Sequence, residues 1–176
     1  MTWLASLLTV APLVPMAACY LRPTPTRYRI VACGFAWSWV GDVLMMESGG
    51  LWTMGHLWVP LQIGTVLLGL SVTRRQRWAI LLGIPALAVV SAVTGPPQEA
   101  MVTLAGSALV LYAARGRMAV SLYLYFGAGS VAYFVMASRA GSPEILIPWL
   151  VYQSLRLVAY GAFVFAVWRV RWADAC

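Results

Sequence analysis

The sequence has little charge and no lysine at all. Of its 176 residues, 62% are hydrophobic and 10% are charged, whereas a soluble globular domain carries roughly 25% charged residues. A chain this apolar cannot cover a surface that faces water, so we predict that its surroundings are lipid. The twelve basic residues are all arginine, which excludes any mechanism that needs a Schiff base on lysine, retinal binding included.

Cysteine is also scarce. Cys19, Cys33 and Cys176 form no CxxC pair, so the sequence predicts neither a disulfide framework nor a metal site, and no cofactor is expected. The net charge of +7 is interpreted as a signal of membrane orientation and not of a nucleic-acid partner. No basic residue precedes the first apolar stretch, which therefore predicts a transmembrane helix in place of a signal peptide.

Long apolar blocks make up most of the chain. Each has about the length that one helix needs to cross the hydrocarbon core, and none shows the alternation of a barrel strand. Seven such blocks lie at Trp3–Leu21, Ile30–Met46, Thr53–Val72, Trp78–Thr94, Ala100–Ala114, Ala119–Ser138 and Ile145–Val167. We predict an all-α, polytopic transmembrane helix bundle of about seven spans, with residues 1–176 forming a single domain.

Arginine is distributed unevenly between alternate loops. Ten of the twelve fall in loops one, three and five and the C-terminal tail: Arg22, Arg27, Arg29, Arg74, Arg75, Arg77, Arg115, Arg117, Arg169 and Arg171. The even loops hold Glu47, Glu99, Glu144 and Arg139. Because cytoplasmic loops are rich in basic residues, we predict an outside N-terminus, a cytoplasmic C-terminus and residence in a bacterial inner membrane, with membrane lipid as the partner.

Three ionisable residues fall within the predicted spans. Asp42, His56 and Arg156 are candidates for function, because charge at membrane depth is costly. At 1.5 Å per residue Asp42 and His56 lie in the outer half of the bundle and Arg156 lies near its middle, from where its long side chain can reach the other two. A structural ion pair between Asp42 and Arg156 is the simpler alternative, as is a headgroup-level position for His56.

Other polar residues lie at helical spacing from Asp42, His56 and Arg156. Ser38 lies four residues before Asp42, and Gln62 lies in the same span as His56. Gln153, Arg156 and Tyr160 share one face of the last span. We predict a polar pocket between the second, third and seventh spans, whose substrate-binding residues are Ser38, Gln62, Gln153, Arg156 and Tyr160. For Gln62 and Gln153, plain hydrogen bonds between helices remain an alternative.

Three stretches resemble a known family. Ala36–Met46 carries Ser38 ahead of Gly41-Asp42, Gly55-His56 opens the next span, and Val151–Gly161 contains Tyr and Gln in the last one. In these stretches the chain resembles, in part, the YhhN-type lysoplasmalogenase-like family of integral membrane proteins. The resemblance implies hydrolysis of the vinyl ether of a lysophospholipid, which gives an aldehyde. It further implies that Asp42 is the catalytic acid and that His56 or Gln153 orients the water. In this interpretation Arg156 binds the substrate phosphate.

Other functions remain open at this point. A membrane cyclase would use the same acid and stabilise carbocations on the rings of Trp37, Trp39, Tyr133 and Phe134. A small seven-span transporter or channel would use Asp42 and Arg156 as a polar gate, although no internal repeat is evident. A structural subunit of a membrane complex would need no chemistry, and neutralising Asp42 would then disturb assembly alone.

Overall fold

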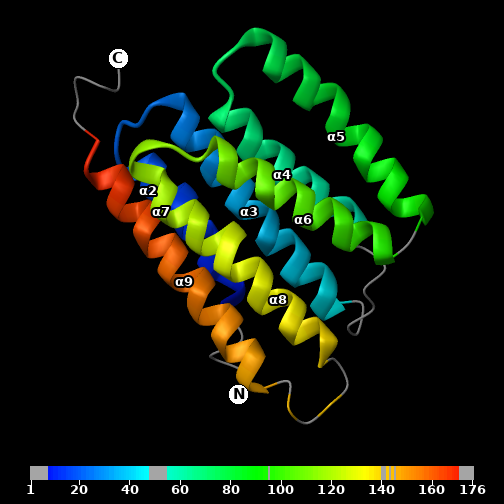
Figure 1. The fold of residues 1–176 in the computed structure, drawn as a ribbon. Coiled ribbons are helices and arrows are strands. Elements are labelled where there is room, and N and C mark those ends of the chain that lie inside the picture. Colours follow the sequence, from blue (N-terminus) through cyan, green and yellow to red (C-terminus); the bar gives the residue numbers. More distant parts are fainter. Residues whose placement is uncertain are drawn as a thin grey trace.

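Every regular element in the described part of the chain is a helix (Figure 1). A computed structural model describes residues 8–47, 55–94, 96–139, 142, 144 and 146–170. Its elements are η1 (Ala11–Leu13), α2 (Val14–Leu21), α3 (Thr26–Glu47), α4 (Gly55–Leu70), α5 (Arg74–Thr94), α6 (Pro96–Ala113), η3 (Gly116–Met118), α7 (Ala119–Leu122), η4 (Tyr123–Ala128), α8 (Gly129–Ser138) and α9 (Leu146–Trp168). The predicted all-α helical bundle is thereby confirmed.

Two blocks contain irregular turns that hydropathy did not predict. The first passes through the 3₁₀ turn η1, where Pro12 lies in the turn and Pro15 is the second residue of α2. Proline has no N–H to give to an α-helical ladder. The sixth runs without interruption from Ala119 to Ser138 but contains the π-helical segment η4. Pro60 and Pro85, in contrast, lie inside α4 and α5 without ending them.

Helices α3 and α4 pack against each other at glycines. A Cβ atom added at Gly69 would lie 2.7 Å from Cγ2 of Val31 and 3.0 Å from the carbonyl oxygen of Arg27. One added at Gly34 would lie 2.4 Å from Cγ2 of Val66. Because small residues let helix backbones approach closely, these two glycines bring Ser38 of α3 and Gln62 of α4 within reach of each other.

The remaining helices surround this pair. Helix α4 also contacts α5 and α6, while α9 contacts α2, α7 and α8, and α5 forms one edge of the bundle (Figure 1). The core runs between α3, α4 and α9, where Phe35, Val66 and Phe163 have no exposed surface. The candidate site lies beside this core, where α3, α4, η4 and α9 meet.

The outward faces of the bundle are apolar. Large side chains that are at least half exposed include Leu82, Val89, Val131, Ile147 and Phe165. Two helical stretches are long and apolar enough to cross a membrane, Gly116–Val135 and Leu146–Trp168. An apolar surface of this extent is unusual for a water-soluble monomer.

Arginines from distant loops meet at one end of the bundle. Nη1 of Arg22, after α2, donates to the carbonyl oxygen of Trp168 at 2.7 Å. Arg117, after α6, donates to the carbonyl oxygen of Arg169. Arg139, which follows α8, lies instead in an exposed ion pair with Glu144, ahead of α9. The loops that carry Arg22 and Arg117 therefore both lie beside the C-terminal end of α9.

Candidate functional site

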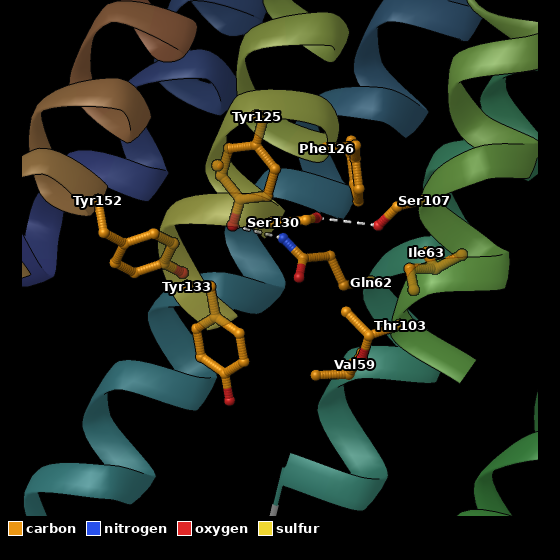
Figure 2. Close-up of a pocket in the computed structure, with 11 residues that line it drawn as sticks. Val59, Gln62, Ile63, Thr103, Ser107, Tyr125, Phe126, Ser130, Tyr133 and Tyr152 are labelled. Carbon is orange, nitrogen blue, oxygen red and sulfur yellow. Dashed lines mark hydrogen bonds between the residues drawn. The ribbon is translucent and has the colours of Figure 1, made fainter. Parts of the chain in front are cut away.

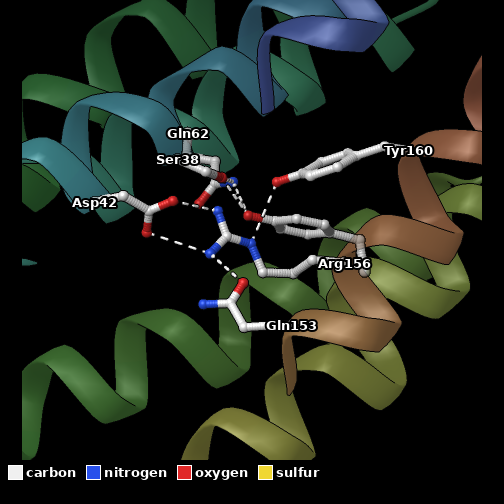
Figure 3. A network of polar contacts seen from close by, with 7 residues as sticks. Ser38, Asp42, Gln62, Gln153, Arg156 and Tyr160 are labelled. Carbon is white, nitrogen blue, oxygen red and sulfur yellow. Dashed lines mark hydrogen bonds and ion pairs between the residues drawn. The ribbon is translucent and has the colours of Figure 1, made fainter. Parts of the chain in front are cut away.

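A bidentate ion pair between α3 and α9 forms the centre of the site (Figure 3). Nη2 of Arg156 lies 2.7 Å from Oδ2 of Asp42, and Nη1 lies 3.2 Å from Oδ1. The side chain of Arg156 is 3% exposed and that of Asp42 is 22% exposed. Guanidinium and carboxylate match each other in such a fork, so both charges are satisfied without water.

Residues of α9 surround the rest of the guanidinium. Nη1 of Arg156 donates to Oε1 of Gln153 at 3.2 Å, and Nε donates to the hydroxyl of Tyr160 at 3.3 Å. The ring of Tyr152 lies under the guanidinium, 5.3 Å from centroid to Cζ. These partners are three or four residues from Arg156 along the helix, which places them on its own face. The chain thus fixes the orientation of Arg156 before any ligand arrives.

A second polar cluster lies beside the ion pair. Nε2 of Gln62 donates to Oγ of Ser38 and to the hydroxyl of Tyr125, both at 2.7 Å, and the two hydroxyls bond to each other. Ser38 and Gln62 are buried, with 2% and 4% of their surface exposed. The rings of Tyr125 and Tyr160 are 5.8 Å apart, so the cluster and the ion pair form one network.

Tyr125 is supplied by the π-helical segment. Segments of π-helix are rare and occur often at functional sites, because the extra residue in the turn re-aims the side chains. Here η4 buries both Tyr125 and Phe126. The ring of Tyr125 lies 5.1 Å from that of Phe35, which holds the hydroxyl against Gln62.

A cavity of about 50 Å³ adjoins the network (Figure 2). One water needs roughly 10–15 Å³ of such space, so the cavity has room for a few waters. Ser107 and Ser130 bond to each other at its wall, at 3.1 Å. Its lining is Val59, Gln62, Ile63, Thr103, Ser107, Tyr125, Phe126, Gly129, Ser130, Tyr133 and Tyr152. It is therefore an aromatic chamber with hydroxyl groups, joined to the ion pair through Gln62, Tyr125 and Tyr152.

Six of the seven residues singled out from the sequence lie in this network. Ser38, Asp42, Gln62, Gln153, Arg156 and Tyr160 are brought together from α3, α4 and α9. The side chain of His56 lies outside the described residues. The cavity is not where we expected it, since its lining comes from α4, α6, η4, α8 and α9 and not from α3. The reason is that the carboxylate of Asp42 faces Arg156 instead.

Several residues of the site were not predicted from the sequence. Tyr125, Tyr152 and the serine pair are not ionisable at neutral pH, so a search for charge at membrane depth passed over them. Tyr125, Gly129 and Tyr133 recur at intervals of four residues, which was the available signal of a shared helix face. Of the aromatics proposed for a cyclase, Tyr133 lines the cavity, whereas Trp39 is 37% exposed.

Comparisons with protein-family models, with curated proteins and with solved structures find no match to this chain. The chemistry of the site must therefore be argued from its geometry. The network offers a carboxylate, a guanidinium that can bind anions, and donors beside a water-sized chamber. Among the described residues, no group of three or more His, Cys, Asp or Glu gathers as metal ligands.

Proposed function

We propose that the chain is an integral membrane protein with seven spans, an outside N-terminus and a cytoplasmic C-terminus, in a bacterial inner membrane. Helices α3, α5 and α9 have 22, 21 and 23 residues, which at 1.5 Å per residue gives each about 30 Å or more. The apolar outer faces and the meeting of the basic loops at one end support this orientation.

We propose further that the network is the active site of a lipid hydrolase that cleaves the vinyl ether of a lysoplasmalogen. One observation carries the proposal: an acid and an oriented guanidinium lie beside a chamber with room for a few waters inside an apolar bundle. Buried ionisable groups of this kind are rare in membrane proteins and mark functional sites. The resemblance to the YhhN-type family in the stretches that supply Ser38, Asp42, Gln153 and Tyr160 supports the same reaction.

The reaction needs one acid and one water. Asp42 protonates the outer carbon of the vinyl ether, and the resulting oxocarbenium ion takes up water at the carbon that bears the oxygen. The hemiacetal that forms then releases a long-chain aldehyde and leaves a hydroxyl on the glycerol carbon. Gln62 and Tyr125 line the cavity beside the network, so they are the residues that hold the water.

The ion pair between Arg156 and Asp42 is the resting state of such a hydrolase. While Arg156 holds both carboxylate oxygens, the carboxyl group of Asp42 is not open to a substrate. A lysophospholipid carries a phosphate, which the fork of a guanidinium binds as well as it binds a carboxylate. Transfer of Arg156 to the phosphate frees the carboxyl group of Asp42 to act as the acid. Substrate binding itself thus prepares the acid.

Aldehyde release from lysoplasmalogen by the purified protein tests this function. We expect release by the wild type and by Glu144→Gln, which removes an exposed carboxylate. We expect Asp42→Asn to lower the rate by at least about 100-fold, the usual contribution of a general acid. An alkyl-ether lysolipid lacks the double bond and gives no aldehyde. No release by the wild type, or full release by a folded Asp42→Asn variant, would overturn the proposal.

A second candidate is a small carrier or channel in which the ion pair is a closed gate. The observation in its favour is that the pair is nearly dry and joins two helices, while the rings of Phe35 and Tyr160 pack 5.5 Å apart beside it. Opening it with Asp42→Asn and Arg156→Gln together would raise proton leak from liposomes that hold a pH-sensitive dye. The hydrolase predicts no such leak.

A further inference from the structure

A second cavity lies between α2 and α3 and is rich in sulfur. Its volume is about 80 Å³, and it is lined by Met16, Cys19, Tyr20, Arg29 and Cys33. None of these residues lines the first cavity or takes part in the ion-pair network. Cys33 precedes Asp42 by nine residues on α3, or about 13 Å at 1.5 Å per residue, so this is a separate place in the fold.

The spacing of the sulfur residues gathers them on facing sides of two helices. Met16 and Cys19 are three residues apart on α2, which places them on one face. Cys33 comes from α3, which packs against α2. The hydroxyl of Thr24 donates to the carbonyl oxygen of Cys19 at 3.3 Å and so ties the turn between the helices to α2.

We propose that this cavity binds a soft monovalent metal ion, Cu(I) by its chemistry, through the sulfur atoms of Cys19, Cys33 and Met16. Thiolate and thioether are the ligands that select Cu(I) over hard cations. Both cysteines are free thiols at the wall of one space large enough for an ion. Binding releases two protons to solvent, one from each thiol, and no electron is transferred.

Charge and donor set both favour a monovalent ion. Two thiolates with one Cu(I) carry a net charge of −1, and Arg29 at the same cavity wall offsets it. Zinc sites use four ligands drawn from Cys, His, Asp and Glu. This cavity offers two such residues, and only the thioether of Met16 raises the set to three donors. The sequence alone gave no sign of a metal site, because its cysteines lie apart along the chain.

The cavity can be reached from outside the bundle. Cys33 and Arg29 are exposed, whereas Cys19 is 3% exposed and packs in the core. An incoming ion therefore reaches Cys33 from the end of α3 that begins at Thr26, past Arg29, and is then held by Cys19 and Met16. The exposed position of Cys33 also makes it the residue whose replacement disturbs packing least.

The test is a titration of the purified full chain, under reducing and oxygen-free conditions, with Cu(I) delivered from a bicinchoninate complex. We expect one Cu(I) per chain, withdrawn from the chelator, with an ultraviolet band from thiolate-to-metal charge transfer. Cys33→Ser should abolish both signals, and Met16→Leu should weaken affinity by more than about tenfold, a loss that even outer ligand partners produce. Ag(I) should compete for the same site.

Two variants serve as controls. Met118→Leu removes a thioether that is buried elsewhere in the core, and Cys176→Ser removes the remaining thiol; both should bind as the wild type does. A wild type that takes no Cu(I) from the chelator, or a Cys33→Ser variant that binds it unchanged, would overturn the proposal. Aldehyde release does not enter the test, so the metal site and the hydrolase stand or fail separately.

Discussion

Arg156 and Asp42 form a fork of two parallel hydrogen bonds although 114 residues separate them in the chain. Each lies on a different helix, and Arg156 is almost wholly buried. The pair therefore fixes the register of α9 against α3. Because the same guanidinium is also held by Gln153 and Tyr160, any change at Asp42 leaves a well-oriented but unpaired cation.

Breaking this pair should cost far more than breaking a surface pair. Removing one partner of a buried ion pair costs about 3–5 kcal/mol, because the other charge stays buried and uncompensated. We expect Asp42→Leu and Arg156→Leu each to lower the midpoint of thermal unfolding in detergent sharply. The double variant should recover much of the loss, since two apolar side chains of suitable size are tolerated in place of a pair.

The matched control for this cycle is the pair of Arg139 and Glu144, whose side chains are 54% and 68% exposed. An exposed pair contributes about 0–1 kcal/mol, so Arg139→Gln and Glu144→Gln should leave the midpoint almost unchanged. Additive losses at Asp42 and Arg156, with no recovery in the double variant, would contradict a direct coupling between them.

Tyr125→Phe removes one hydroxyl from the second polar cluster. Nε2 of Gln62 would keep its bond to Ser38 but lose the one to Tyr125. We expect a loss of about 1–3 kcal/mol of stability, the usual result of leaving a buried polar group without its partner. Calorimetry in detergent measures it. Tyr123→Phe, on the same π-helical segment but with Tyr123 51% exposed, should be close to neutral.

The sequence predicted the helices because its apolar blocks are long and show no alternation of strand type. Apolar length alone located the blocks, and the sixth agrees with the structure at both ends, Ala119 and Ser138. Hydropathy carries no information on turn type, which is why η1 and η4 were not predicted. Both are local departures from the α-helical ladder within a continuous apolar stretch.

The candidate site was predicted in part for a similar reason. Asp42 and Arg156 are conspicuous in an apolar sequence, because charge at depth is costly, and helical spacing then indicated Gln153 and Tyr160. The place of the cavity depends on how α6 and α8 face α4, which requires tertiary packing. The spacing of Tyr125, Gly129 and Tyr133 indicated a shared face. The π-helical segment changes the phase of the helix, so spacing alone did not show which helices that face meets.

Orientation in the membrane can be tested with single cysteines in a chain whose own three are replaced by serine. A cysteine at Ser142 lies in the loop between α8 and α9, and one at Arg115 lies between α6 and η3, at the end where basic residues meet. Since basic loops stay in the cytoplasm, an impermeant maleimide added to intact cells should label the first and not the second. Permeabilised cells should label both. Labelling of the Arg115 position alone in intact cells would reverse the proposed orientation.

Gly69 and Gly83 give opposite predictions for the same substitution. At Gly69 a Cβ would meet the backbone of α3, 3.0 Å from the carbonyl oxygen of Arg27 and 3.1 Å from the nitrogen of Val31, and backbone atoms cannot rotate away. Gly69→Ala must therefore push α3 and α4 apart, and overpacking of this kind costs about 1–3 kcal/mol.

At Gly83, on α5, a Cβ would meet nothing within 4 Å, so Gly83→Ala should stabilise by about 0.5–1 kcal/mol through lower backbone entropy in the unfolded chain. Thermal unfolding of the two variants side by side should shift the midpoint in opposite directions. A shift of the same sign in both would mean that α3 and α4 do not pack as closely as Gly69 and Val31 indicate.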